Sequence, residues 1–333
     1  MIPANGWAQD SWPPSAAPES VGWSAERLAD AVSAAERRGY ATGIVMVRGN
    51  VIAQWGDTSQ PQKMASIRKS LLSSLYGIAV EAGQIDTLST LEQLGIDELG
   101  GLTDSERSAT VADLLTTSSG VYLPSAYAPA GMLRGLPERG SHTPGSNWHY
   151  NNWDFNALGT IYERQTGRSI FAAFDTLIAR PIGMQDYDVD AGVYERSEAS
   201  LHAAYLFKLS ARDLARFGML YLRRGKWDGL QIVPAGWVET STSAHVLGSR
   251  AGRAFGYGFM WWVGVEGGLF PGIEVPSGSF AAHGAPVQAL FVVPAMDMVI
   301  VSLAETVNPS PASFLDNDDE RAVLQLILAA ARD

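Results

Sequence analysis

The chain has 333 residues, of which 46% are hydrophobic and 18% charged, and its formal net charge at pH 7 is −11. This composition is that of a globular protein and excludes an intrinsically disordered chain. The acidic excess argues against nucleic acid or an anionic membrane as a partner. Cysteine is absent, which excludes disulfides, thiolate metal sites and cysteine nucleophiles.

Missing motifs disfavour further classes. No apolar segment is long enough to span a bilayer, and residues 1–14 have neither the basic nor the apolar region of a signal peptide. We therefore expect a cytoplasmic protein, or a periplasmic or secreted one if a signal segment has been removed. None of the five histidines forms a compact metal-binding motif, and both G-x-S-x-G and the phosphate-binding loop are missing. No catalytic metal is expected.

The first part of the chain shows helical and then strand-like patterns after a Pro- and Ser-rich leader. Apolar residues recur at helical spacing after Ser24, a good N-cap. Two β-rich runs follow, separated by the hairpin turn signal Gly49-Asn50. The next segment is apolar on most sides, which is typical of a buried helix, and Gly83 ends it. The expected ranges are 1–20 for the leader, 24–38 for the first helix, 44–47 and 51–55 for the hairpin, and 66–82 for the buried helix.

The middle of the chain is mostly helical, and strands return near its C-terminal end. The expected helices are 111–116, 155–166, 170–178 and 211–224, and the expected antiparallel strands are 257–265, 279–282, 288–293 and 298–304, followed by a closing helix over 321–330. The turn between the last two strands falls at residues 294–297.

This order of elements predicts an α+β fold. Residues 1–65 and 230–333 most simply join into one antiparallel sheet flanked by the terminal helices, and residues 66–229 form a mostly helical second domain. The buried helix that starts at Ser66 then lies where the two domains meet, which is a favoured place for an active site.

Ser66-Ile67-Arg68-Lys69 places a Ser three residues before a Lys, in a chain with only four lysines. On a helix these two positions share a face, so hydroxyl and amine can meet. Burial and the helix N-terminus both disfavour the charged amine. A neutral amine beside a hydroxyl is a general base beside a nucleophile, although the same spacing also occurs as a solvated Ser and a surface Lys.

Two further segments carry candidate chemistry. Tyr150-Asn151-Asn152 follows a Pro-Gly turn; a nearby Lys ammonium would lower the pKa of the Tyr150 phenol, and Asn152 could donate to a substrate carbonyl. Read alone, this tripeptide is more typical of a polar turn. Ala282-His283-Gly284-Ala285 lies on an expected edge strand, where a backbone N–H can bind an oxyanion. A lone His on a strand is more often a core or surface residue.

Together the three segments resemble the motifs of serine β-lactamases and penicillin-binding proteins. The Tyr-x-Asn form is similar to that of class C β-lactamases, the related D-Ala-D-Ala carboxypeptidases, esterases and 6-aminohexanoate-dimer hydrolases. The resemblance covers nearly the whole chain, because further family-like segments occur in the right order at 18–22, 114–120, 144–145, 213–218, 256–258, 261–262 and 291–294.

The resemblance implies a β-lactamase/transpeptidase-like fold and a serine hydrolase that needs no cofactor. It implies that Ser66 is the nucleophile and that Lys69 and Tyr150 act as a coupled proton relay. It further implies that the backbone N–H groups of Ser66 and Ala285 form the oxyanion hole and that Asn152 positions the substrate.

The third motif departs from the family's Lys-Thr-Gly. Counting back from Phe291 aligns Gly284 with the Gly and leaves His283 and Ala282 in place of the Thr and Lys. A register one residue later would put Pro286, which has no N–H, at the oxyanion donor position. In the family, this Lys and Thr contact the β-lactam carboxylate. Their loss puts efficient β-lactam hydrolysis in doubt, and His283 would replace part of their role or tune Tyr150.

The implied substrate is a small molecule, preferably a small carboxylic ester. The open alternatives are an amide (an aminohexanoate oligomer, a D-amino-acid peptide or a β-lactam), acyl transfer to an acceptor other than water, and a catalytically silent binding module. Four aromatic residues are candidates for an apolar acyl pocket, with a place in the core as the other interpretation, above all for the Trp residues: Tyr122, Tyr127, Trp148 and Trp153.

Overall fold

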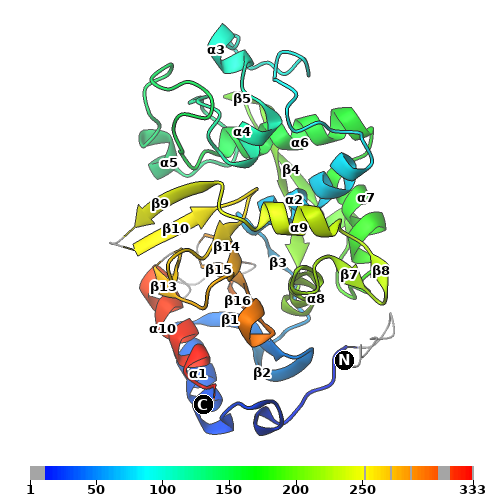
Figure 1. Ribbon diagram of the computed structural model, residues 1–333, viewed down its shortest axis with the longest axis vertical. Coiled ribbons are helices and arrows are strands. Elements are labelled where there is room, and N and C mark those ends of the chain that lie inside the picture. The colour runs from blue at the N-terminus through cyan, green and yellow to red at the C-terminus, as the bar shows by residue number, and fades with distance from the viewer. Residues whose placement is uncertain (1–11, 251–252, 271, 286, 307–315, 332–333) are drawn as a thin grey trace.

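A single eight-stranded antiparallel sheet contains both ends of the chain. The computed structural model describes residues 12–250, 253–270, 272–285, 287–306 and 316–331, so residues 1–11 of the expected leader lie outside the described residues. The strand order is β2-β1-β16-β15-β14-β11-β10-β9 (Figure 1). These strands are β1 (Tyr40–Val47), β2 (Asn50–Gly56), β9 (Val246–Arg250), β10 (Arg253–Tyr257), β11 (Trp262–Val263), β14 (Phe280–Gly284), β15 (Gln288–Val293) and β16 (Met298–Ala304).

Helices cover both faces of the centre of this sheet. Every residue of β15 and β16 is buried, although successive side chains point to opposite faces. The terminal helices α1 (Ala25–Arg38) and α10 (Asn317–Leu328) pack against each other, and α1 also contacts β1 and β2. Helix α8 (Ala211–Leu222) contacts β1, β15 and β16. The predicted α+β architecture, an antiparallel sheet with packed terminal helices, is confirmed.

Two strand predictions are wrong. The single strand expected over 257–265 is interrupted, because the chain turns between β10 and β11: the Gly258 N–H donates to the Trp261 carbonyl (2.8 Å), and Met260 has a left-handed φ of 64°. The strand that holds His283 is not an edge strand, because β14 pairs with β11 on one side and with β15 on the other. Strand β9, which extends the sheet beyond β10, was not expected.

Most of the remaining elements form the upper and middle parts of the molecule in Figure 1, whereas the hairpin of residues 268–274 lies lower, beside α10. The remaining helices are α3 (Asp104–Arg107), α4 (Val111–Leu115), α5 (Ala130–Arg134), α6 (Asn152–Thr166), α7 (Ile170–Phe174) and α9 (Ala235–Ser241). Short two-stranded sheets are interspersed: β3 (Gln62–Lys63) with β6 (Lys208–Leu209), β4 (Val193–Ser197) with β5 (Ser200–Leu206), β7 (Lys226–Trp227) with β8 (Leu230–Gln231), and β12 (Gly268–Leu269) with β13 (Ile273–Glu274). The β4–β5 hairpin falls in a region that we expected to be helical.

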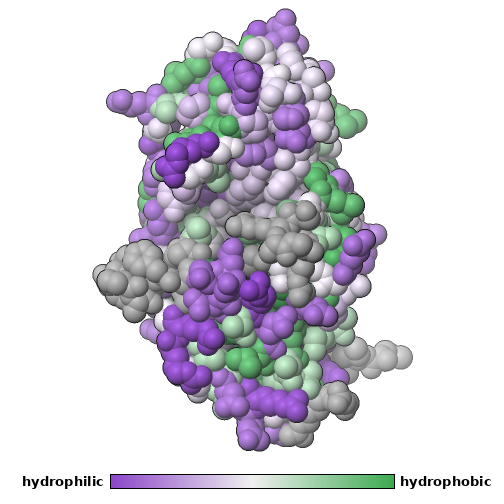
Figure 2. Space-filling model, turned by 90° about the vertical axis from the view of Figure 1, so that its left-hand side faces the viewer, coloured by the Kyte–Doolittle hydropathy of each residue, from purple (hydrophilic) through white to green (hydrophobic). Residues whose placement is uncertain are grey.

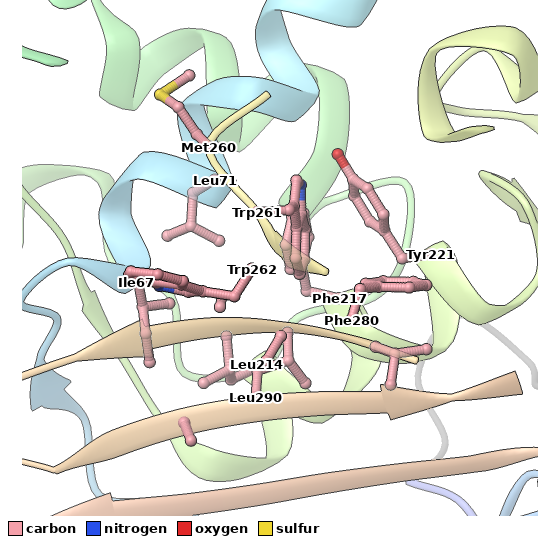
Figure 3. Packing of buried hydrophobic residues seen from close by; sticks show 14 of the residues in the cluster. Ile67, Leu71, Leu214, Phe217, Tyr221, Met260, Trp261, Trp262, Phe280 and Leu290 are labelled. Carbon is pink, nitrogen blue, oxygen red and sulfur yellow. The ribbon is translucent and has the colours of Figure 1, made fainter. Parts of the chain in front are cut away.

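Helix α2 (Ile67–Glu81) connects the sheet to the upper part. Twelve of its fifteen residues are buried, and it contacts β14 and β15 as well as α6, α7 and α9. Figure 3 shows Ile67 and Leu71 of this helix beside Trp262, above Leu290 of β15. Gly77 lets α9 approach closely, because a Cβ at that position would lie 2.4 Å from the Trp237 ring. The helix is therefore enclosed by protein on nearly all sides.

The outer surface is mixed in character. On the face seen in Figure 2, hydrophilic residues border a smaller hydrophobic area in the lower half of the molecule. Among the described residues, no helix is both long enough and apolar enough to cross a membrane.

The close approach at Gly77 predicts a stability difference between two helical glycines. Gly77→Ala should lower the free energy of unfolding by about 1–3 kcal/mol, because the added methyl group must displace the Trp237 ring. Gly236→Ala, on the partner helix α9, is the matched control: a Cβ there meets nothing within 4 Å, so this change should be neutral or stabilise by up to about 1 kcal/mol. Urea denaturation of both variants tests this, and equal effects would contradict the packing argument.

Candidate active site

Ser66 stands at the N-terminus of α2, with its hydroxyl free of the usual capping role. It is the N-cap residue but makes no side-chain cap hydrogen bond. Its Oγ instead lies 2.8 Å from Lys69 Nζ, to which it is hydrogen-bonded. The segment before it is fixed by the buried Gln288 of β15, whose Oε1 accepts from the Ala65 N–H (3.0 Å) and whose Nε2 donates to the Lys63 carbonyl (2.9 Å). Sequence reasoning missed Gln288; a lone Gln at the start of an apolar strand was its only signal.

Lys69 joins Ser66 to Tyr150. Its Nζ forms a second hydrogen bond, with Tyr150 Oη (2.7 Å), and lies 4.3 Å from the ring centroids of both Tyr150 and Phe155. The side chain is almost fully buried. Burial, and secondarily the positive charge of Arg68, holds the pKa of Lys69 well below its usual value. Both effects act against the charged form of the amine and toward the neutral form, which can accept a proton.

The electrostatic expectation for Tyr150 is wrong in direction. We expected a neighbouring ammonium to lower the pKa of the phenol. Burial instead raises the pKa of Tyr150 to about 12, against smaller lowering effects of the Ser66 hydrogen bond and Arg68. The lowered pKa of Lys69 also weakens the ammonium effect that we expected to act on the phenol. Tyr150 is thus a protonated group that can relay or return a proton.

The two Asn residues of the Tyr-Asn-Asn tripeptide make different contacts. Asn151 is structural: its Nδ2 donates to the Val121 carbonyl (2.6 Å), and its backbone N–H donates to Thr117 Oγ1 (3.0 Å). Asn151 also caps α6, which therefore begins at Asn152 and not at residue 155 as expected. Asn152 Nδ2 donates to the Tyr127 carbonyl (2.8 Å), and its Oδ1 is buried without a partner.

Gly284 brings the third motif against the backbone of Ser66. A Cβ on this residue would lie 2.9 Å from the Ser66 backbone nitrogen, so only glycine fits here without displacement. Within the described part of the chain, nothing accepts a hydrogen bond from the Ser66 N–H. Ala285 follows directly and is exposed. The next residue, Pro286, on which the choice of register depended, lies outside the described residues.

His283 faces the C-terminal helix. Its Nε2 donates to Glu320 Oε2 of α10 (2.7 Å), and its ring meets Phe270 edge-on, with the centroids 5.2 Å apart. The side chains of His283 and Glu320 are 9% and 2% exposed, and Glu320 Oε1 is buried without a partner. Ala282, its neighbour on β14, is buried and points to the opposite face of the sheet.

A cavity of about 820 Å³ opens beside these groups. Its lining contains most of the predicted site residues and several aromatic ones that sequence reasoning missed: Ala65, Ser66, Tyr127, Ala128, Pro129, Met132, Trp148, His149, Tyr150, Asn152, Glu195, Phe255, Trp262, Phe270, His283, Gly284, Ala285 and Asn317. The rings of Trp262 and Phe270 stack at 3.9 Å, and Trp148 packs edge-on against Phe255 at 5.5 Å. Together they form an aromatic wall.

Two of the predicted pocket residues lie elsewhere. Trp153 is fully buried, and its Nε1 donates to Glu98 (2.7 Å), so it belongs to the core. Tyr122 is hydrogen-bonded to His142 (3.2 Å) and accepts from Asn147 (3.1 Å), and it does not line the cavity. Tyr127 and Trp148 do line it. Among the described residues there is no group of three acidic or His side chains that could hold a metal ion.

The chain is similar in sequence to known hydrolases. The chain is 33% identical over 108 residues to the esterase EstB of Burkholderia gladioli, a match that covers 32% of this chain and 27% of the esterase. It is 24% identical over 275 residues to the 6-aminohexanoate-dimer hydrolase of Paenarthrobacter ureafaciens, covering 74% of this chain and 66% of that protein. The chain thus spans less than two-thirds of the length of either relative.

The fold is also found in solved structures. A protein from Bacillus anthracis, described as a candidate 6-aminohexanoate-dimer hydrolase, superimposes with a TM-score of 0.68 at 21% identity, over 98% of this chain and 89% of that one. The profile of the family described as "Beta-lactamase" matches residues 25–325. The chain therefore belongs to the β-lactamase family of serine hydrolases.

Proposed function

We propose that this serine hydrolase cleaves small carboxylic esters through an acyl-enzyme on Ser66. The observation that carries the proposal is the 2.8 Å contact between Ser66 Oγ and the buried Lys69 amine, beside an aromatic cavity whose described lining contains neither Lys nor Arg. The contact between hydroxyl and amine supports nucleophilic catalysis, and the lack of cations in the described lining supports a neutral substrate.

The proposed reaction proceeds by two proton-balanced acyl transfers. The Lys69–Tyr150 pair accepts the Ser66 hydroxyl proton while Oγ bonds to the ester carbonyl carbon. Backbone N–H groups of Ser66 and Ala285 donate to the oxyanion, and Asn152 orients the substrate. The bond to the leaving alkoxide then breaks, and the pair returns the proton to that oxygen. Water repeats the sequence on the acyl carbon and releases Ser66 with its proton.

The cavity walls support a neutral, apolar substrate. The aromatic wall of Trp148, Phe255, Trp262 and Phe270 offers apolar surface to an acyl or aryl group. Ala282 supplies no cation where the family has a Lys. A substrate carboxylate would therefore meet no Lys or Arg among the described lining residues, at a cost of about 2–5 kcal/mol.

A second candidate is hydrolysis of a linear amide that carries an ammonium group. Glu195 is the one Asp or Glu among the described lining residues. Its side chain is 43% exposed and lies 3.7 Å from Lys63, a loose pairing that leaves the carboxylate accessible. A substrate ammonium could compete for it.

The nucleophile can be tested directly. A fluorophosphonate probe should add one covalent label to the wild-type chain and none to Ser66→Ala, because loss of the hydroxyl removes the covalent route. Ser70→Ala is the matched control: it lies one turn further along α2, donates to the Met260 carbonyl (2.7 Å), and should label like the wild type. Intact mass spectrometry and ester assays give the readout. Labelling without turnover would indicate a binding module, and no labelling would refute the nucleophile assignment.

Substrate preference gives a second test. Short-chain aryl esters should be hydrolysed with kcat/KM at least about 100-fold above penicillins or cephalosporins, which matches the missing ion pair. Steady-state assays on one preparation decide this, and comparable β-lactam turnover would contradict it.

A linear amino-amide forms the third arm of that assay. If its kcat/KM exceeds that of the esters and falls in Glu195→Gln while ester turnover does not, the second candidate replaces the first.

The contact between His283 and Glu320 generates a stability prediction. His283 is hydrogen-bonded to the Glu320 carboxylate, so each single change to Leu leaves a buried polar group without its partner, whereas the double change leaves none. The double variant should lose about 1–3 kcal/mol less than the sum of the single losses. The exposed pair Arg321–Asp318 on the same helix is the control, with an expected coupling below about 1 kcal/mol. Strictly additive losses at His283 and Glu320, measured by denaturation, would show that the contact contributes nothing.

A further inference from the structure

Arg68, between the nucleophile and the Lys69 amine in sequence, is a buried cation with few partners. It is 1% exposed. Its Nη2 donates to Asn156 Oδ1 of α6 (2.9 Å), and its guanidinium carbon lies 4.4 Å from the ring centroid of Tyr205 on β5. Its Nε and Nη1 are buried without a hydrogen-bond partner. Three elements therefore hold the group in a fixed place without fully satisfying it.

No carboxylate in the described part of the chain forms an ion pair with this charge. Among the ion pairs found between described residues, none includes Arg68. The nearest contacts are an amide oxygen and an aromatic face, which stabilise a guanidinium but leave its net charge intact. Buried charges in proteins are normally paired or bound to a metal. An exception next to a reactive centre calls for a functional reason.

The charge acts on the two members of the proton relay. After burial, which is the largest cause, Arg68 is the next cause that lowers the pKa of Lys69. It also lowers the pKa of Tyr150, which burial raises to about 12. The titratable groups around the guanidinium are Lys69 on α2, Tyr150 before α6 and Tyr205 on β5. All three are cationic or neutral when protonated, so a fixed positive charge opposes protonation of each of them.

We propose that Arg68 is a positioning residue that acts through Lys69: its fixed, unneutralised guanidinium opposes a second positive charge and so keeps the amine in the base-competent form. This inference rests on the proposed function of the Ser66–Lys69–Tyr150 group. It assigns to Arg68 no contact with the substrate, because Arg68 does not line the cavity.

The first test is the pH dependence of kcat/KM for a neutral aryl ester. Activity that needs neutral Lys69 is lost as pH falls through its pKa. In Arg68→Met, removal of the like charge raises the pKa of Lys69, so the acidic limb of the kcat/KM profile should shift by about one pH unit to higher pH. At pH values below this limb, kcat/KM should be about tenfold lower than in the wild type. Arg68→Lys should keep the wild-type limb. Arg216→Met, which removes a buried guanidinium from α8, should lower the melting temperature but leave the limb in place.

The second test does not depend on activity. The chain has four lysines, Lys63, Lys69, Lys208 and Lys226, so carbon-13 labelling of the lysine Cε atoms gives a simple NMR spectrum in which Lys69→Met assigns one signal. The Lys69 signal should titrate about one pH unit higher in Arg68→Met than in the wild type. If Arg68→Met folds poorly, Arg68→Gln, which keeps a donor for Asn156, takes its place.

The outcomes distinguish a failure of the role of Arg68 from a failure of the proposed hydrolase function. An unchanged midpoint in the neutral variants, or failure of Arg68→Lys to restore it, overturns the role of Arg68 whatever the activity. A wild-type protein that is neither labelled at Ser66 nor active on esters overturns the proposed function instead. A shifted midpoint and a shifted acidic limb together support both.

Discussion

The enclosure of the Lys69 amine is the constraint on which the rest of the structure depends. An amine is a useful base only where its charged form is disfavoured, and burial is the largest contribution here. Helix α2 must therefore have almost no solvent-exposed face, which is why it contacts both the sheet and the helices above it. A surface helix with the same Ser-x-x-Lys spacing would hold an ordinary ammonium.

The enclosure also buries serine hydroxyls of α2, and buried hydroxyl groups need hydrogen-bond partners within the protein. Ser70 Oγ donates to the Met260 carbonyl and Ser73 Oγ to the Phe259 carbonyl, both at 2.7 Å. These acceptors lie in the turn that separates β10 from β11. A continuous strand would have used the same carbonyls in its own ladder. The break in the strand thus leaves these two carbonyls available as acceptors for the buried serines of α2.

Sequence patterns predicted the local part of this arrangement well. The three-residue spacing of Ser66 and Lys69 is a property of one helix turn, and the α+β class follows from the order of elements. The failures concern long-range contacts. Trp153 pairs with Glu98, 55 positions away, and so lies in the core, whereas Phe255, Trp262 and Phe270 line the cavity because β10, β11 and the segment before β13 converge there. The pKa of Tyr150 depended on burial, which a motif does not encode.

The C-terminal helix α10 contributes to the cavity and not only to the back of the sheet. Asn317 lines the cavity, and Glu320 is hydrogen-bonded to His283 on the strand that ends beside Ser66. Strands β14 and β15, which hold Gly284 and Gln288 against the start of α2, also come late in the chain. During synthesis, Ser66 and Lys69 therefore leave the ribosome long before the elements that complete their surroundings. The surroundings of the Lys69 amine are therefore complete only when the last strands and α10 have folded onto the start of α2.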